Sequence, residues 1–268
     1  MRQGQEFIRL RQEKSLFNKI VFVLIVLILI FFYGVALFGQ EWQIPGSRVS
    51  SLSILYRMFI APFTSAENFA LFGDYIVPMF ETIAIAYAGG IAASLIAVPI
   101  GFLASRNIGG PFNYVGKAIL NGIRSIPSFL FAVVLVAAIS LGPFPGVIAI
   151  SVNSIGMIGK LYAEIIESID MNTVNAIRAS GGNRIQAMWY GVLPQVLPDF
   201  ISASLYRFEI DVRASTVLGI VGAGGIGIPL DVARRTRNWE GVGAILIIVI
   251  IFVTLIDFIS GKIRSKLV

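Results

Sequence analysis

The stretch DMNTVNAIRASGGNRIQAMWYGVLPQVLP, residues 170–198, is a polar segment between two long hydrophobic parts of the chain. Asp170 or Asn172 can cap a helix here, because either side-chain oxygen accepts a hydrogen bond from the free N–H groups of a first helical turn. Gly181 and Gly182 permit the left-handed backbone turn that ends such a helix. The stretch therefore predicts a short helix that stops at a glycine turn.

A second helix is predicted directly after this turn. Asn183 can cap it, and Pro194 and Pro198 mark the place where the chain returns to hydrophobic sequence. Together, the helix, the glycine turn and the second helix ending in Leu-Pro resemble the cytoplasmic "EAA" loop of ABC-importer permeases. In that family the first helix docks into a cleft on a separate ATPase subunit, which implies the same role for residues 171–182. An ordinary connection between two membrane spans is the alternative.

The match to the family pattern, which is Glu-Ala-Ala, then glycine, then Leu-Pro, is partial. Asn175 replaces the glutamate, Ile177 replaces the third motif position, and Gly191 occupies the usual isoleucine position. The loss of the glutamate weakens any expectation of an ion pair from that position. The residues in register with the pattern are Ala176, Ala179, Gly181, Leu193 and Pro194.

The composition indicates a membrane protein, whose hydrophobic surface is surrounded by lipid. It has 268 residues, of which 56% are hydrophobic and 13% are charged, and its mean hydropathy is +0.84. Soluble domains of this length are not so apolar. The chain has no cysteine and no histidine, which excludes disulfides, the common zinc sites, and histidine or cysteine catalysis. We expect no metal site and no cofactor in this chain.

Long hydrophobic runs, the first of which carries no charge, predict an all-α membrane protein with six transmembrane helices. A helix needs about 20 residues to cross the hydrocarbon core, and shorter runs need help from their neighbours. A lead-in helix from Phe112 is expected before the third span, and residues 142–146 are expected to form a turn. Residues 49–60 form either a helix lying on the membrane surface or a plain loop. The expected spans are residues 20–38, 76–104, 128–141, 147–159, 198–221 and 242–259.

The second of these spans carries small residues that would let another helix approach closely. They are Gly89, Gly90, Ala92, Ala93 and Ser94.

Lysine and arginine decide the orientation in the membrane. Six spans place both termini on one side, and that side holds fourteen of these residues, against five on the other side. The positive-inside rule therefore places both termini in the cytoplasm, together with a coupling loop at residues 160–194. Most of the lysine and arginine residues behind the net charge of +6 lie on the cytoplasmic side in this topology, so nucleic acid is not an expected partner. We divide the chain into residues 1–75, with the tail, first span and extracytoplasmic loop, and a permease core at residues 76–268.

The stretch Tyr206–Arg213 in the fifth span contains four charges, which cannot face lipid unpaired because each costs at least about 2.5 kcal/mol near the bilayer centre. Helical spacing predicts two ion pairs, Arg207 with Asp211 and Glu209 with Arg213. This helix either lines a translocation path, where Arg207 or Arg213 meets an anion, or holds a buried structural network.

The string VGAGGIG, residues 221–227, has the glycine spacing of a dinucleotide-binding loop. A membrane span precedes it and Pro229 follows it, so that interpretation fails and no nucleotide site is expected. Gly222, Gly224 and Gly225 are instead expected to break the helix near the outer membrane face, beside protein or water. Their exposed N–H groups could help to hold a phosphorus oxyanion.

These strings together strongly resemble permeases of phosphonate-type ABC importers, over about residues 76–260. Tyr206–Arg213 and Val221–Gly227 are the most specific parts of the match. The resemblance implies the type I importer (MetI-like) permease fold in the cytoplasmic membrane. It also implies that the substrate is phosphonate, phosphite or phosphate.

The expected partners follow from the same resemblance. They are a second copy of the chain in a homodimer, ABC ATPase subunits that bind ATP and magnesium, and an extracytoplasmic substrate-binding protein. An ion-coupled secondary transporter of an anionic solute is the alternative, with Glu209 and Asp211 as ion sites. A membrane enzyme is a weaker alternative, because the remaining acidic residues are dispersed along the sequence.

Overall fold

The computed structural model describes residues 19, 21–35 and 51–267, which fall into two units divided between residues 50 and 51. In the first unit, Val21–Val35 is an apolar helix inside the expected first span. The remainder of that span, residues 1–18 of the N-terminal tail and residues 39–50 of the 39–74 loop lie outside the described residues. The expected domain boundary after residue 75 stays a prediction.

Every regular element that the structure describes in residues 51–267 is helical. For residues 49–60 the sequence left a helix and a plain loop as alternatives, and the structure has a helix, α2, in this segment. The elements in order are α2 (Ser51–Phe59), η1 (Ala61–Phe63), α3 (Ala66–Ala104), α4 (Arg106–Gly109), η2 (Gly110–Phe112), α5 (Asn113–Arg124), α6 (Ser128–Ala138), α7 (Pro143–Glu167), α8 (Met171–Ala179), α9 (Arg184–Gln186), the π-helix η3 (Ala187–Val192), α10 (Leu193–Leu218), η4 (Gly219–Val221), α11 (Gly227–Arg235) and α12 (Trp239–Arg264).

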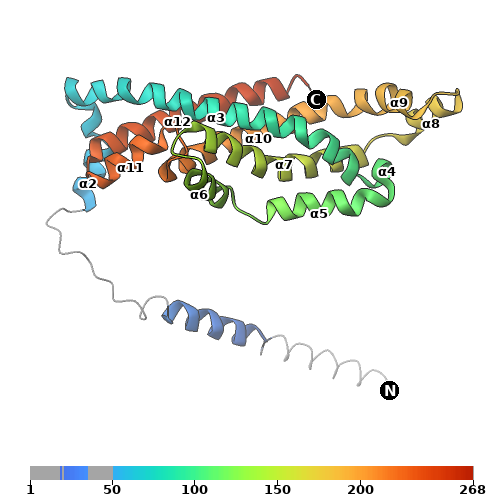
Figure 1. The fold of residues 1–268 in the computed structure, drawn as a ribbon. Helices are drawn as coiled ribbons and strands as arrows, with labels where there is room; N and C mark the ends of the chain where they lie inside the picture. Colours follow the sequence, from blue (N-terminus) through green and yellow to red (C-terminus); the bar gives the residue numbers. More distant parts are fainter. Residues whose placement is uncertain (1–18, 20, 36–50, 268) are drawn as a thin grey trace, which may run out of the picture. The chain divides into compact units, whose positions relative to one another are not determined.

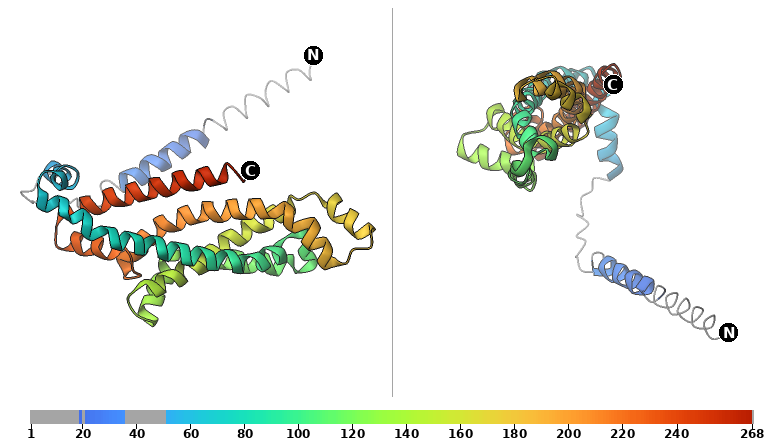
Figure 2. Two further views of the ribbon diagram at one scale, coloured as in Figure 1. Left: turned by 90° about the horizontal axis from the view of Figure 1, so that it is seen from above. Right: turned by 90° about the vertical axis from the view of Figure 1, so that its right-hand side faces the viewer.

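The long helices α3, α7, α10 and α12 run along the bundle, and α5 and α6 lie on its side (Figures 1 and 2). α4, α8 and α9 lie at one end, while α2 and α11 lie at the other. The loops around residues 105–112 and 168–192, which the charge count assigns to one side of the membrane, therefore lie at the same end. The orientation of the bundle in the membrane stays a prediction.

Small residues allow α3 and α7 to pack closely, as the sequence predicts. A Cβ atom added at Gly89 would lie 2.8 Å from Cγ2 of Ile150, and one at Gly101 would lie 2.8 Å from Cβ of Tyr162. Ala93 and Ala97 are fully buried on the same helix. In a membrane, close van der Waals packing of this kind takes the place of the hydrophobic effect as the force between helices.

Within the described residues, length and composition alone identify three helices that can cross a membrane: α3, α7 and α12. A fourth span is possible if α5 and α6 are counted together, although they meet at an angle of 75°. α6 has 11 residues and is too short to span by itself. α10 is long enough, but its charges set it apart from an ordinary apolar span. The expected count of six spans stays a prediction.

Several helices have other bounds than the expected spans, such as α3, which begins at Ala66, and α12, which covers Trp239–Arg264. The predicted turn at residues 142–146 is wrong, because only Gly142, with φ of 138°, makes the turn, and α7 begins at Pro143. Proline is well suited to a first helical turn, where no N–H donor is needed. The fourth span also continues past Gly159 to Glu167, so the first part of the expected coupling loop is the end of a helix.

The close approach of α7 to the glycine string gives a prediction about stability. In Gly146→Val the new side chain would overlap the backbone carbonyl oxygen of Ala223, and backbone cannot move aside cheaply. We expect a loss of about 1–3 kcal/mol in the free energy of unfolding, measured on the purified protein in mild detergent. Gly122→Val on α5 is the matched control, because nothing lies within 4 Å of its Cβ position. Equal stability of the two variants would contradict this packing.

Candidate functional site

The arm at one end of the bundle (residues 170–192, comprising α8, the glycine turn, α9 and η3) has the caps that the sequence predicts. The side chain of Asp170 accepts a hydrogen bond of 2.9 Å from the backbone N–H of Asn172. Gly181 follows the helix with φ of 87°, a left-handed conformation that favours glycine. Asn183 and Gln186 form a reciprocal capping box at the start of α9. Local side-chain chemistry therefore fixes the shape of the arm.

The side chain of Gln195 attaches the arm to the bundle through both of its amide atoms. Oε1 of Gln195, on α10, accepts from the backbone N–H of Asp170 at 2.9 Å, and its Nε2 donates to the carbonyl of Gly191 at 2.6 Å. Gly191 itself allows η3 to approach α8, since a Cβ there would lie 3.3 Å from Cα of Val174. The glycine that departs from the family pattern thus has a packing role.

The outer face of the arm is open to a partner. Val174 is the only residue of α8 that is fully buried, whereas Asn175, Ala176 and Ala179 are exposed. Leu193 is half-buried and Pro194 is exposed at the start of α10. Large apolar and aromatic side chains are also exposed on the arm, including Ile185, Trp189 and Tyr190.

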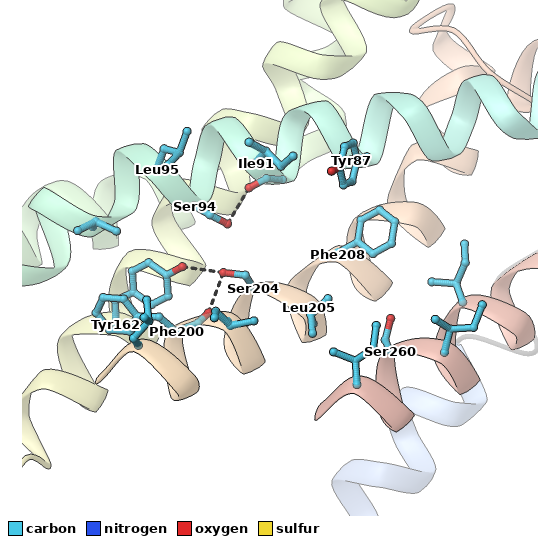
Figure 3. Close-up of a pocket in the computed structure, with 17 residues that line it drawn as sticks. Tyr87, Ile91, Ser94, Leu95, Tyr162, Phe200, Ser204, Leu205, Phe208 and Ser260 are labelled. Atoms are coloured by element: carbon cyan, nitrogen blue, oxygen red, sulfur yellow. Dashed lines mark hydrogen bonds between the residues drawn. The ribbon is translucent and has the colours of Figure 1, made fainter. Parts of the chain in front are cut away.

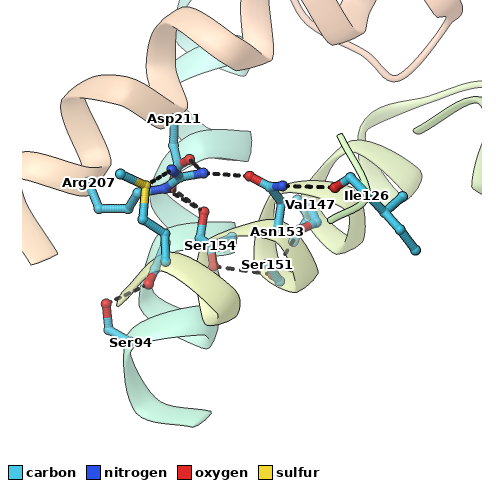
Figure 4. A network of polar contacts seen from close by, with 11 residues as sticks. Ser94, Ile126, Val147, Ser151, Asn153, Ser154, Arg207 and Asp211 are labelled. Carbon is cyan, nitrogen blue, oxygen red and sulfur yellow. Dashed lines mark hydrogen bonds and ion pairs between the residues drawn. The ribbon is translucent and has the colours of Figure 1, made fainter. Parts of the chain in front are cut away.

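The predicted pair of Arg207 and Asp211 is confirmed. Nη2 of Arg207 lies 2.9 Å from Oδ1 of Asp211, and both residues are buried (Figure 4). Ser154 on α7 donates to Asp211 at 2.7 Å and accepts from Nε of Arg207 at 3.0 Å. Asn153 accepts from Nη2 of Arg207 at 2.7 Å. These contacts supply the additional hydrogen bonds that a desolvated ion pair requires.

The second predicted pair, Glu209 with Arg213, is wrong. Glu209 accepts instead from Arg264 at 2.7 Å, and Arg213 pairs with Asp257. Both partners lie on α12, so a neighbouring helix rather than the next turn of α10 supplies the opposite charges.

The two arginines of the candidate path differ in their exposure to solvent. Arg207 is 6% exposed and bonded to protein groups, whereas the Arg213 side chain is 51% exposed. A contact of Arg213 with an anion stays a prediction.

The glycine string breaks the helix as expected. Gly222, Gly224 and Gly225 have φ values of 88°, 86° and 73°. The N–H of Gly225 donates to Glu81 at 3.1 Å, and that of Gly222 donates to the carbonyl of Gly219 at 2.9 Å. These two amides therefore serve the packing of the string, and they are not free to hold an oxyanion as the sequence suggested.

An apolar cavity of about 440 Å³ lies between α3, α7, α10 and α12 (Figure 3). None of its lining residues is charged, and its polar groups are hydroxyls such as those of Tyr162 and Ser204, which are 2.6 Å apart. Such a lining favours an acyl chain or another apolar group over a phosphorus oxyanion. The sequence analysis missed this cavity, and the small residues Gly90 and Ser94 in its wall were the available signal.

The described residues form a helical bundle of membrane-spanning type, with buried ion pairs inside it and an exposed arm at one end. Comparison with known proteins gives the family: residues 97–267 match the family described as binding-protein-dependent transport system inner membrane component. A phosphite transport system permease protein from Stutzerimonas stutzeri is 40% identical over 200 residues, covering 74% of this chain and 73% of that protein. A phosphate-import permease protein from Mycolicibacterium smegmatis is 36% identical over 249 residues, covering 87% of this chain and 47% of that protein.

Among solved structures, a chain of the inward-facing MetNI methionine ABC transporter matches with a TM-score of 0.65 and 23% identity, covering 76% of this chain and 99% of that chain. This likeness shows the fold. The chain belongs to the family of inner-membrane components of binding-protein-dependent transport systems, and it has the type I importer permease fold that the sequence predicted. The relatives are permeases, so nothing among them favours a membrane enzyme or an ion-coupled secondary transporter.

The buried pair on α10 gives a prediction about stability. Arg207→Met or Asp211→Leu alone leaves one charge buried without its partner, and we expect each to cost about 3–5 kcal/mol of unfolding free energy. The double variant removes both charges and should cost clearly less than the sum of the two single variants. Unfolding in mild detergent measures all three. Strictly additive losses would contradict the pairing.

Proposed function

We propose that this chain is the permease subunit of an ATP-driven importer for phosphonate, phosphite or phosphate. The support for this substrate class is the similarity to permeases named for phosphite transport and phosphate import. The permease itself binds no ATP, and ATP with magnesium is held by a separate ATPase subunit. An extracytoplasmic binding protein delivers the substrate to a homodimer of permeases.

One observation carries the coupling to an ATPase: the arm is open on its outer face and hydrogen-bonded to the bundle on its inner face. Exposed Asn175, Ala176 and Ala179 form the surface for the ATPase subunit. Gln195 joins the start of α8 to the start of α10, so a displacement of α8 moves α10 with it. When ATP closes the ATPase dimer, the arm acts as a lever that switches the spans between inward-facing and outward-facing states.

Reconstituted transport tests this proposal. The permease, its ATPase and its binding protein are placed in liposomes, and uptake of labelled phosphite, phosphate and a simple phosphonate is compared. We expect uptake of at least one of them to require ATP and to survive collapse of the proton gradient. Uptake that needs the proton gradient and no ATP would support a secondary transporter instead. Uptake of none of the three would reject the substrate class.

The glycine turn gives a second prediction, because Gly181 has φ of 87° and no atom within 4 Å of its Cβ position. Gly181→Val therefore acts through the backbone alone, and it should change the angle between α8 and α9. We expect ATP-driven uptake to fall about tenfold or more, because a small misplacement of a coupling element is costly. The permease should still purify with its partner copy.

Gly261→Val is the matched control, since that position also has open space but no positive φ. Full transport by Gly181→Val would count against the lever.

A further inference from the structure

A chain of side-chain contacts joins the middle of α10 to the bend between α5 and α6 (Figure 4). Asp211 pairs with Arg207, and Arg207 donates to Oδ1 of Asn153 at 2.7 Å. Asn153 in turn donates from Nδ2 to the backbone carbonyl of Ile126 at 3.4 Å. One amide side chain on α7 therefore contacts both the guanidinium of α10 and the backbone of the bend.

The bend lies on the side of the bundle, between its two ends (Figure 1). α5 starts beside α4, at the end of the bundle that holds the arm, and its 12 residues carry the chain about 18 Å along the bundle. Gly156, near the middle of α7, packs against this place, since a Cβ there would lie 2.8 Å from Cγ of Arg124. Arg124, which the charge count placed in a cytoplasmic loop, is thus level with the middle of α7.

The bend combines irregular backbone with exposed polar groups. α5 and α6 meet at 75°, and the segment between them is not helical. Asn121, Arg124 and Ser125 are exposed here, in a chain whose other exposed side chains are largely apolar. At membrane depth, broken backbone and polar side chains are tolerated where they face protein or line a water-filled cavity. The bend therefore belongs beside the translocation path.

α10 connects this bend to the arm. Arg207 lies near the middle of α10, and α10 begins at Leu193, directly after the arm that Gln195 holds in place. α10 runs as one helix from Leu193 past Arg207 to Leu218, with Pro198 inside it. Movement of the arm therefore reaches Arg207, then Asn153, and then Ile126.

We propose that Asn153 and Arg207 are positioning residues that make the α5–α6 bend move with α10, so that the bend gates the substrate path. This proposal rests on the proposed function, because it needs an ATP-driven movement of the arm. It assigns Arg207 a role inside the protein instead of a contact with substrate. It also explains why a buried charge pair stands on the one long helix that begins at the arm.

The coupling ratio, meaning substrate imported per ATP hydrolysed, tests the relay in the reconstituted complex. Asn153→Leu removes both contacts, and we expect the ratio to fall roughly 3- to 30-fold while ATP hydrolysis continues. Asn153→Asp keeps an oxygen for Arg207 and loses the donor to Ile126, so it should also lower the ratio. Ser151→Ala is the matched control on the same helix, because Ser151 bonds only the carbonyls of Val147 and Gly89.

Because the chain has no native cysteine, a single introduced thiol can report on the solvent access of the bend. Ser125→Cys introduces a single thiol in the permease, and its reaction with a water-soluble maleimide is compared in nucleotide-free and vanadate-trapped complexes. We expect labelling rates to differ between the two states, and Asn153→Asp to reduce that difference. Equal rates in both states, or an unchanged coupling ratio in both Asn153 variants, would overturn the relay. Failure of the wild-type complex to import with ATP would instead reject the proposed function.

Discussion

The desolvation of one ion pair governs the arrangement of the core helices. Arg207 and Asp211 are buried in a bundle made almost entirely of apolar side chains, where an unpaired charge is not tolerated. Their mutual attraction offsets this cost only if the remaining donors and acceptors are also satisfied. Ser154 and Asn153 provide those partners, and both lie on α7. α10 must therefore pack against α7 at one register and in one rotation.

α7 also packs closely against α3, in the same rotation that its contacts with α10 require. Gly89, Gly101 and Ala93 allow the two helices to meet without large side chains between them. α3, α7 and α10 thus form a unit in which polar contacts set the rotation and small residues set the distance. Gln195 holds the arm to this unit, while α12 supplies the opposite charges for the buried Glu209 and the exposed Arg213 of α10. Rigid connections of this kind suit a protein that has to transmit movement over a long distance.

Local chemistry explains which features the sequence could predict. The caps at Asp170 and Asn183 and the left-handed turn at Gly181 depend on residues a few positions apart, and all three are present. The pair of Arg207 and Asp211 was also predictable, because i,i+4 residues share one face of a helix. The helical class and the family followed from composition and from the strings around residues 175–227.

Features that depend on distant neighbours were not predictable in this way. Glu209 and Arg213 have suitable spacing for each other, but α12 presents opposite charges to both, and only the packing reveals that. Pro143 was expected in a turn because proline commonly occurs there, whereas it equally suits the first turn of a helix. The bend at residues 125–127 and the apolar cavity arise from the angles between helices, which one sequence does not specify.

The π-helix at Ala187–Val192 has a consequence for how this chain is compared with its relatives. A π segment accommodates an extra residue within a helix, and such segments often occur at functional sites. Loss of one residue there would restore ordinary α geometry without turning the parts on either side, because the wider π turn has absorbed that residue. The π segment therefore allows the interval between the glycine turn and Leu-Pro to differ by one residue while α8 keeps the same face outward. Two family members that differ in this way would present equivalent faces of that helix to whatever binds there.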